Sequence, residues 1–132
     1  ASTAIVARSR SRNSTQVSVR RLQAPSTGQA QALLGQLVAV YRIGSCQPLP
    51  AHPEINSYFA QCLSQNAEPD KRSVKFRWNY HDAAWDSLFA SLEDLLIAPT
   101  DARLPNNSAA TGQKQLALTI WKPLLAAEVE AW

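Results

Sequence analysis

The stretch SVKFRWNYHDAAWDSLFASLEDLLIAP, residues 73–99, gathers more large apolar side chains than any other part of the chain. Over 74–79 apolar and polar residues alternate, which is the period of a half-buried β-strand. From Trp85 to Leu96 the apolar residues repeat at helical spacing, with Asp82 placed to cap a helix and Pro99 placed to end it. We predict a strand over 73–79, then a helix, and expect the pair to form the core.

Two further helices are predicted ahead of this stretch. The first covers 28–43, where Ser26 or Thr27 can act as the cap. Its apolar stripe consists of Ala30, Leu33, Leu34, Leu37, Val38 and Tyr41. Gly35 costs about 1 kcal/mol relative to Ala inside a helix, so we expect it to allow close packing against a neighbour. The second helix covers 53–65 and begins with Pro53, which suits a first helical position.

Both ends of the chain contain strand-like patterns. Residues 1–24 form either a β-hairpin, with a turn near 12–15, or an extended arm that orders on a partner; we favour the hairpin. Residues 115–121 alternate as a strand does, although this pattern is ambiguous, and Pro123 can open a short final helix. The predicted fold class is α+β: an N-terminal β-hairpin and small sheet with three main α-helices packed beside it. We expect 1–132 to be a single domain, with 1–24 as the basic arm or hairpin and 25–132 as a helix-rich body.

The net charge of +3 is small, but positive charge is concentrated near the N-terminus. The arginines of this segment are Arg8, Arg10, Arg12, Arg20 and Arg21, whereas the first acidic residue is Glu54. Such clustering favours a polyanionic partner; the alternative is a solvated, mobile terminus. No apolar run approaches the ~20 residues that a membrane span needs, and two cysteines are too few for a disulfide framework. We therefore expect an intracellular protein that does not enter a membrane.

A search for catalytic and metal-binding patterns gives no candidate. The chain has no phosphate-binding loop, dinucleotide-binding fingerprint or nucleophile-elbow motif. His52 and His81 share no local ligand spacing with Cys46 or Cys62. Cys62 falls on a helical apolar face, where it is expected to be a small core residue. We expect no enzyme activity, no metal and no cofactor.

A second basic cluster surrounds the predicted central strand. Lys71, Arg72, Lys75 and Arg77 lie next to Phe76 and Trp78. Cations of this kind can hold phosphates while an aromatic ring stacks on a base. Alternation instead favours both aromatic rings facing the core, which leaves Lys75 and Arg77 free to contact phosphate together with the N-terminal arginines.

Three further segments are FRWN at 76–79, WDSLFASL at 85–92 and TDARL at 100–104. In this order they resemble the central part of the coat proteins of rod-shaped plant viruses of the tobamovirus type. KQLALTIWKP at 114–123 is similar to that family's closing segment. The resemblance implies that Asp101 and Arg103 lie near RNA. Coat proteins of single-stranded RNA phages are a second similar family, by chain length, N-terminal hairpin and late helices.

Together these features predict a self-assembling viral coat (nucleocapsid) subunit that packages single-stranded RNA through its arginine-rich arm. Its expected partners are RNA and copies of itself, and its expected location is the virion and the host cytoplasm. The predicted RNA-binding residues are Arg8, Arg10, Arg12, Arg20, Arg21, Lys71, Arg72, Lys75, Arg77, Asp101 and Arg103. The alternative is a small protein-interaction adaptor or regulatory subunit without nucleic acid, because apolar residues and four Trp suit an interface as well as a core.

Overall fold

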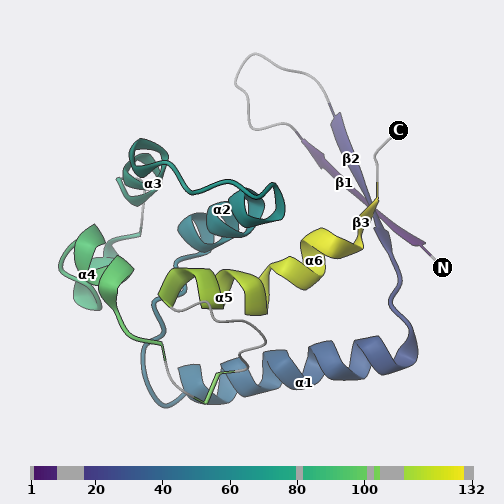
Figure 1. Ribbon diagram of the computed structural model, residues 1–132, viewed down its shortest axis with the longest axis horizontal. Helices are drawn as coiled ribbons and strands as arrows, with labels where there is room; N and C mark the ends of the chain where they lie inside the picture. Colours follow the sequence, from purple (N-terminus) through teal and green to yellow (C-terminus); the bar gives the residue numbers. More distant parts are fainter. Residues whose placement is uncertain (1, 9–16, 80–81, 101–102, 105–111, 130–132) are drawn as a thin grey trace.

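The computed structural model describes residues 2–8, 17–79, 82–100, 103–104 and 112–129, and the fold is a helical body with a strand pair at one side (Figure 1). The helices are α1 (Thr27–Gly44), α2 (Pro53–Ser64), α3 (Lys71–Trp78), the 3₁₀ helix η1 (Ala83–Ser87), α4 (Leu92–Ile97), α5 (Gly112–Ile120) and α6 (Lys122–Ala127). The strands are β1 (Ser2–Arg8), β2 (Val17–Gln23) and β3 (Glu128–Val129).

The predicted α+β class is wrong, because the body is helical and the two strands predicted within it are helices. Residues 73–79 lie in α3 and at its end, and Asp70 caps this helix by accepting a hydrogen bond from the Ser73 amide at 2.8 Å. Val74 and Trp78 are one helical turn apart, so both face inward. An isolated strand here would also leave its backbone groups without partners, whereas a helix satisfies them internally.

The segment 115–121 is likewise helical. Its buried residues are Gln113, Gln115, Leu116, Ala117 and Thr119, which cover more than half of the helix circumference, and Ile120 packs against the first core cluster. The alternation of apolar residues that suggested a strand therefore does not define one buried face. Pro123 does lie in the first turn of a short final helix, as predicted, and that helix is α6.

β1 and β2 pair in antiparallel register, from Ser2 opposite Gln23 to Arg8 opposite Val17. β3 adds a short antiparallel pairing, with Arg21 opposite Val129. Figure 1 shows these strands beyond the end of α6 and away from α3 and α4. The turn that we predicted near 12–15 lies outside the described residues.

The single helix predicted after Asp82 is divided into two short ones. Asp82 does act as a cap, accepting from the Ala84 amide at 2.9 Å, but it caps η1. Ser91 then begins α4, because its hydroxyl accepts from the Asp94 amide at 3.1 Å and donates to the Asp94 carboxylate at 2.8 Å. A serine bonded in this way favours a helix start over a helix interior.

Two apolar clusters form the core. The first contains the buried side chains of Ile43, Leu104 and Leu116. The second contains Ile55, Val74 and Leu95, against which Trp78, Trp85, Phe89, Leu92 and Leu96 pack. The expectation that residues 73–99 contribute the main apolar contacts is therefore confirmed for the second cluster.

Between the clusters lies a buried amide pair. Asn56 on α2 donates through Nδ2 to both the side-chain Oε1 and the main-chain O of Gln113, each at 3.1 Å. Gln113 donates in turn to the carbonyls of Pro50 and Leu95. One glutamine side chain thus joins α5 to α2, to α4 and to the loop before α2.

The first two predicted helices are present as α1 and α2. Ser26 caps α1 by accepting from the Gln29 amide at 3.3 Å, and Pro53 is the first residue of α2. The expectation that Gly35 packs closely against a neighbour is wrong, since a Cβ built there meets no atom within 4 Å. Part of the apolar stripe of α1 is exposed as well: Leu34 keeps 62% and Tyr41 74% of its surface.

Candidate nucleic-acid interface

The outward side of α3 combines positive charge with an aromatic ring. Lys71, Arg72 and Lys75 are exposed, and Phe76 keeps 60% of its surface. Lys71 and Lys75, like Arg72 and Phe76, are four residues apart and therefore neighbours on the helix surface. We call these four residues the α3 basic face. Among the described residues no acidic side chain forms an ion pair with its three cations.

The opposite side of α3 attaches the helix to the body. Val74 is buried and Trp78 half-buried, and both belong to the cluster around Ile55 and Leu95. The Asp70 amide also donates to the Tyr58 hydroxyl of α2 at 3.3 Å. Both ends of α3 are therefore attached to the body, so the α3 basic face lies on a fixed helix.

The charges at the start of α3 are unfavourable for the helix itself. Lys71 and Arg72 lie in the first turn, where the helix dipole disfavours cations by about 0.3–1 kcal/mol each. Asp70 offsets this as a capping carboxylate, and its hydrogen bonds from Ser73 lower its pKa below the ordinary value. The two cations therefore gain no stability from the helix dipole.

Arg77, which belongs to the same predicted RNA-binding set, contacts the body of the protein. Its guanidinium lies over the Tyr58 ring, 3.9 Å from the ring centroid, and donates to the Ser73 carbonyl at 3.0 Å. The side chain is half-buried. Arg77 thus joins α3 to α2 by a cation–π contact.

The predicted arginines of the N-terminal arm lie partly in the strands. Arg8 ends β1, and Arg20 and Arg21 lie in β2. Arg21 is half-buried and its backbone pairs with Val129. Arg10 and Arg12 lie outside the described residues.

The two residues implied by the tobamovirus resemblance are separated from the α3 basic face in sequence. Arg103 is exposed in the connection between α4 and α5, beside the buried Leu104. Asp101 lies outside the described residues. The structure therefore brings together three of the predicted residues, Lys71, Arg72 and Lys75, on one surface.

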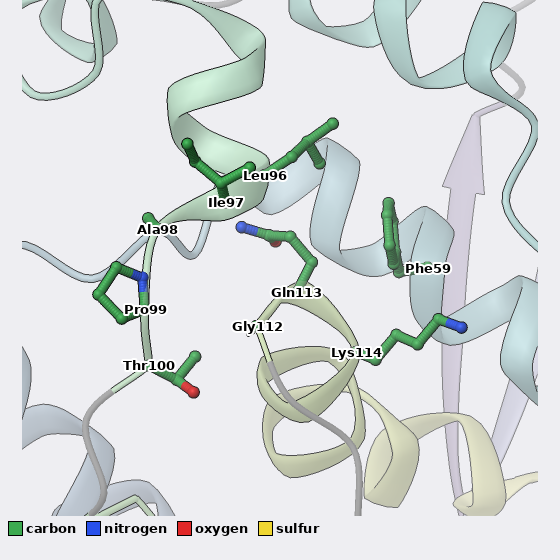
Figure 2. Close-up of a pocket in the computed structure, with 9 residues that line it drawn as sticks. All are labelled: Phe59, Leu96, Ile97, Ala98, Pro99, Thr100, Gly112, Gln113 and Lys114. Carbon is green, nitrogen blue, oxygen red and sulfur yellow. The ribbon is translucent and has the colours of Figure 1, made fainter.

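A pocket of about 760 Å³ opens elsewhere, between the end of α4, the start of α5 and Phe59 of α2 (Figure 2). Its lining residues are Phe59, Leu96, Ile97, Ala98, Pro99, Thr100, Gly112, Gln113 and Lys114. The polar groups among them are engaged in structure: Gln113 holds the buried amide pair, and Lys114 forms an ion pair with Glu68 at 2.9 Å. None of the described lining residues is a carboxylate, histidine or cysteine, so this lining offers no acid–base pair.

The described histidine and one of the two cysteines are buried in the body. His52 is buried, caps α2 by accepting from the Ile55 amide at 3.4 Å, and lies 4.9 Å from the Trp85 ring between centroids. Cys62 is buried on α2, as expected for a small core residue, and Cys46 is exposed. His81 lies outside the described residues. Within the described part of the chain, no three His, Cys, Asp or Glu side chains gather as a metal site would require.

Sequence reasoning missed Phe76 as an exposed residue, because the strand interpretation assigned it to the core. A helix over 71–78 that buries Val74 and Trp78 puts residue 76 on the far side. Asp70 followed three residues later by Ser73 was the local sign of a helix start.

Comparisons with models of protein families, with curated proteins and with solved structures found no match for this chain. No described helix has both the length and the apolar character that crossing a membrane requires.

Proposed function

We propose that the chain is an RNA-binding subunit that assembles with copies of itself, as viral coat and nucleocapsid proteins do. The observation that supports this proposal is the α3 basic face. Three exposed cations and one largely exposed aromatic ring share one side of a helix whose other side is anchored in the core.

The chemistry of this face suits a single strand better than a duplex. Lys71 and Lys75 are about 6 Å apart along the helix axis, which lets each contact its own phosphate. Phe76 adds a ring on which an unpaired base can stack, an interaction worth about 1–3 kcal/mol per base. Neither contact reads a particular base, so the expected binding tolerates many sequences, as packaging requires.

The N-terminal arginines provide a second basic region. Arg8, Arg10 and Arg12 occur at every second position, which on an extended chain places successive residues of the set on one side, about 6.5–7 Å apart. The strands lie beyond α6, whereas α3 lies beyond α2 (Figure 1). An RNA strand that contacts both regions would cross the body, which favours recognition of the phosphate backbone over recognition of one short sequence.

Salt dependence of binding tests the proposal. Fluorescence anisotropy with a short labelled single-stranded RNA should show affinity that falls steeply with salt. Replacing Lys71, Arg72 and Lys75 with alanine should weaken binding and flatten the slope of log affinity against log salt by about two units, at ~0.7 per phosphate.

The matched control removes two exposed cations elsewhere, Arg42 and Lys122, and should leave the slope nearly unchanged. Circular dichroism of each variant establishes that it is folded. If the triple variant and the control have equal slopes, the α3 basic face does not contact phosphate and the proposal loses its main support.

A second candidate is a protein-interaction adaptor, favoured by the exposed apolar residues on α1. Heparin or RNA chromatography separates the two functions. An adaptor without nucleic acid should pass through the column at moderate salt, whereas the RNA-binding subunit should be retained.

A further inference from the structure

The helix α1 is apolar over more than half of its circumference. Ile43 and Val40 pack in the first core cluster. The adjoining side holds Leu34, Leu37, Val38 and Tyr41, which keep between 46% and 74% of their surface exposed. Leu37, Val38 and Tyr41 follow Leu34 by three, four and seven residues, so the four side chains form one continuous stripe along the helix. We call this stripe the outer face of α1.

A helix that is apolar over so wide an arc is typical of one that is buried around most of its circumference. Within the described chain the outer face has no cover, and Gly35 beside it has open space around its Cα. Figure 1 shows α1 along one edge of the molecule, with the other helices on its inner side. The stripe is therefore accessible to another molecule along the length of the helix.

The charges around the outer face favour an identical copy as the partner. No charged residue occurs from Leu22 to Tyr41, and Arg42 is the only one in α1. Two copies that each carry +3 can thus approach through this face without opposing like charges across its apolar part. A partner recognised by its own charge would instead require acidic or basic residues here.

We propose that the outer face of α1 binds the outer face of a second copy in an antiparallel, two-fold arrangement. The two-fold axis passes between Leu37 and Val38. Leu34 then lies opposite Tyr41 of the second copy, whereas Leu37 and Val38 each face the same residue of the second copy. The two Arg42 residues then lie near opposite ends, about 13 Å apart along the helix axis, which exceeds the Debye length of ~8 Å at physiological salt. Gln31, exposed on the same flank as Arg42, comes opposite the second copy's Arg42 and offers its amide oxygen as an acceptor.

This arrangement deepens the proposed function, because it supplies the first contact between subunits of an assembly. It does not depend on RNA, so it is tested on the full chain alone. Sedimentation equilibrium over a concentration series should give a mass of at least twice the 14.5 kDa of one chain.

Val38→Glu places two carboxylates opposite each other at the two-fold axis and should convert the protein to a monomer. The side chain is on the far side of α1 from the core, so the variant should keep the circular dichroism spectrum of the parent. Val38→Lys should be monomeric for the same reason. An equimolar mixture of the two variants should associate again, because Glu then faces Lys.

Ile97→Glu is the matched control, since Ile97 is 78% exposed on α4 and lies outside the outer face. It should not change the mass of the assembly. A parent protein that stays monomeric, a Val38→Glu variant that stays associated, or a mixture that fails to associate would each overturn the antiparallel contact. Fluorescence anisotropy of labelled RNA with Val38→Glu tests RNA binding separately from self-association. RNA binding by the monomeric variant supports the RNA-binding proposal, whether or not the antiparallel contact is correct.

Discussion

The buried pair Asn56–Gln113 determines how α2, α4 and α5 pack, and its energetic role can be measured. Asn56 is 0% and Gln113 4% exposed. Asn56→Leu keeps the number and branching of the side-chain heavy atoms but removes the Nδ2 donor that serves Gln113 Oε1 and the Gln113 carbonyl at 3.1 Å each. Leaving a buried acceptor without a donor costs about 1–3 kcal/mol, a figure that already includes the lost hydrogen bond.

One contribution to the free energy of unfolding favours the Asn56→Leu variant. Asn56 Oδ1 is buried and has no hydrogen-bond partner among the described residues, so leucine removes a cost that the parent protein carries. We therefore expect Asn56→Leu to lower the free energy of unfolding by about 2 kcal/mol. Gln113→Leu should cost more, about 4 kcal/mol, because the carbonyls of Pro50 and Leu95 lose their donor as well.

The assay is urea unfolding followed by tryptophan fluorescence, at one fixed protein concentration. The double variant should be less destabilised than the sum of the single variants by about 1–2 kcal/mol, since the second substitution removes a bond that the first has already broken. Additive effects, or an Asn56→Leu variant as stable as the parent, would refute the reasoning that this amide pair joins the helices.

Three further perturbations address the helix α1, the cap of α3 and the arm. Gly35→Ala should raise the melting temperature by about 3 °C, because alanine favours a helix interior by about 0.5–1 kcal/mol and its Cβ meets no neighbour; an unchanged or lower value would mean that this site is crowded. The folded-state pKa of Asp70 is lowered, so its charge stabilises the protein above the unfolded-state pKa and this contribution is lost as pH falls through the folded value. Denaturant unfolding should therefore show an advantage over Asp70→Asn that disappears from about pH 4 downward, and a pH-independent difference would contradict this. Replacing Arg8, Arg10 and Arg12 together with alanine should leave the circular dichroism spectrum of the body intact and flatten the salt slope of RNA binding by about two units; equal slopes would show that the arm does not contact phosphate.

Sequence reasoning located α1 and α2 because both have strong start signals, the Ser26 cap and the first-position Pro53. It failed for α3 and α5, where short apolar runs fit both periods. In α3 the alternation of 74, 76 and 78 looked like a strand, and only the helical contact of Val74 and Trp78 with Ile55 decides between the two. Tertiary packing of this kind is not visible in a local pattern.

The candidate interface was predicted in part. Lys71, Arg72 and Lys75 were identified by charge alone, and the structure places them on one exposed side of α3. The contact of Arg77 with Tyr58 was not visible in the sequence, because it depends on how α3 lies against α2. The apolar stripe of α1 was predicted, but such a stripe does not reveal whether its partner belongs to the same chain.

Electron microscopy of the purified protein mixed with single-stranded RNA at low salt tests the central claim most directly. An RNA-binding subunit that assembles with itself should form regular rods or shells, and RNA within them should resist nuclease. Dispersed protein with fully digested RNA would contradict the account.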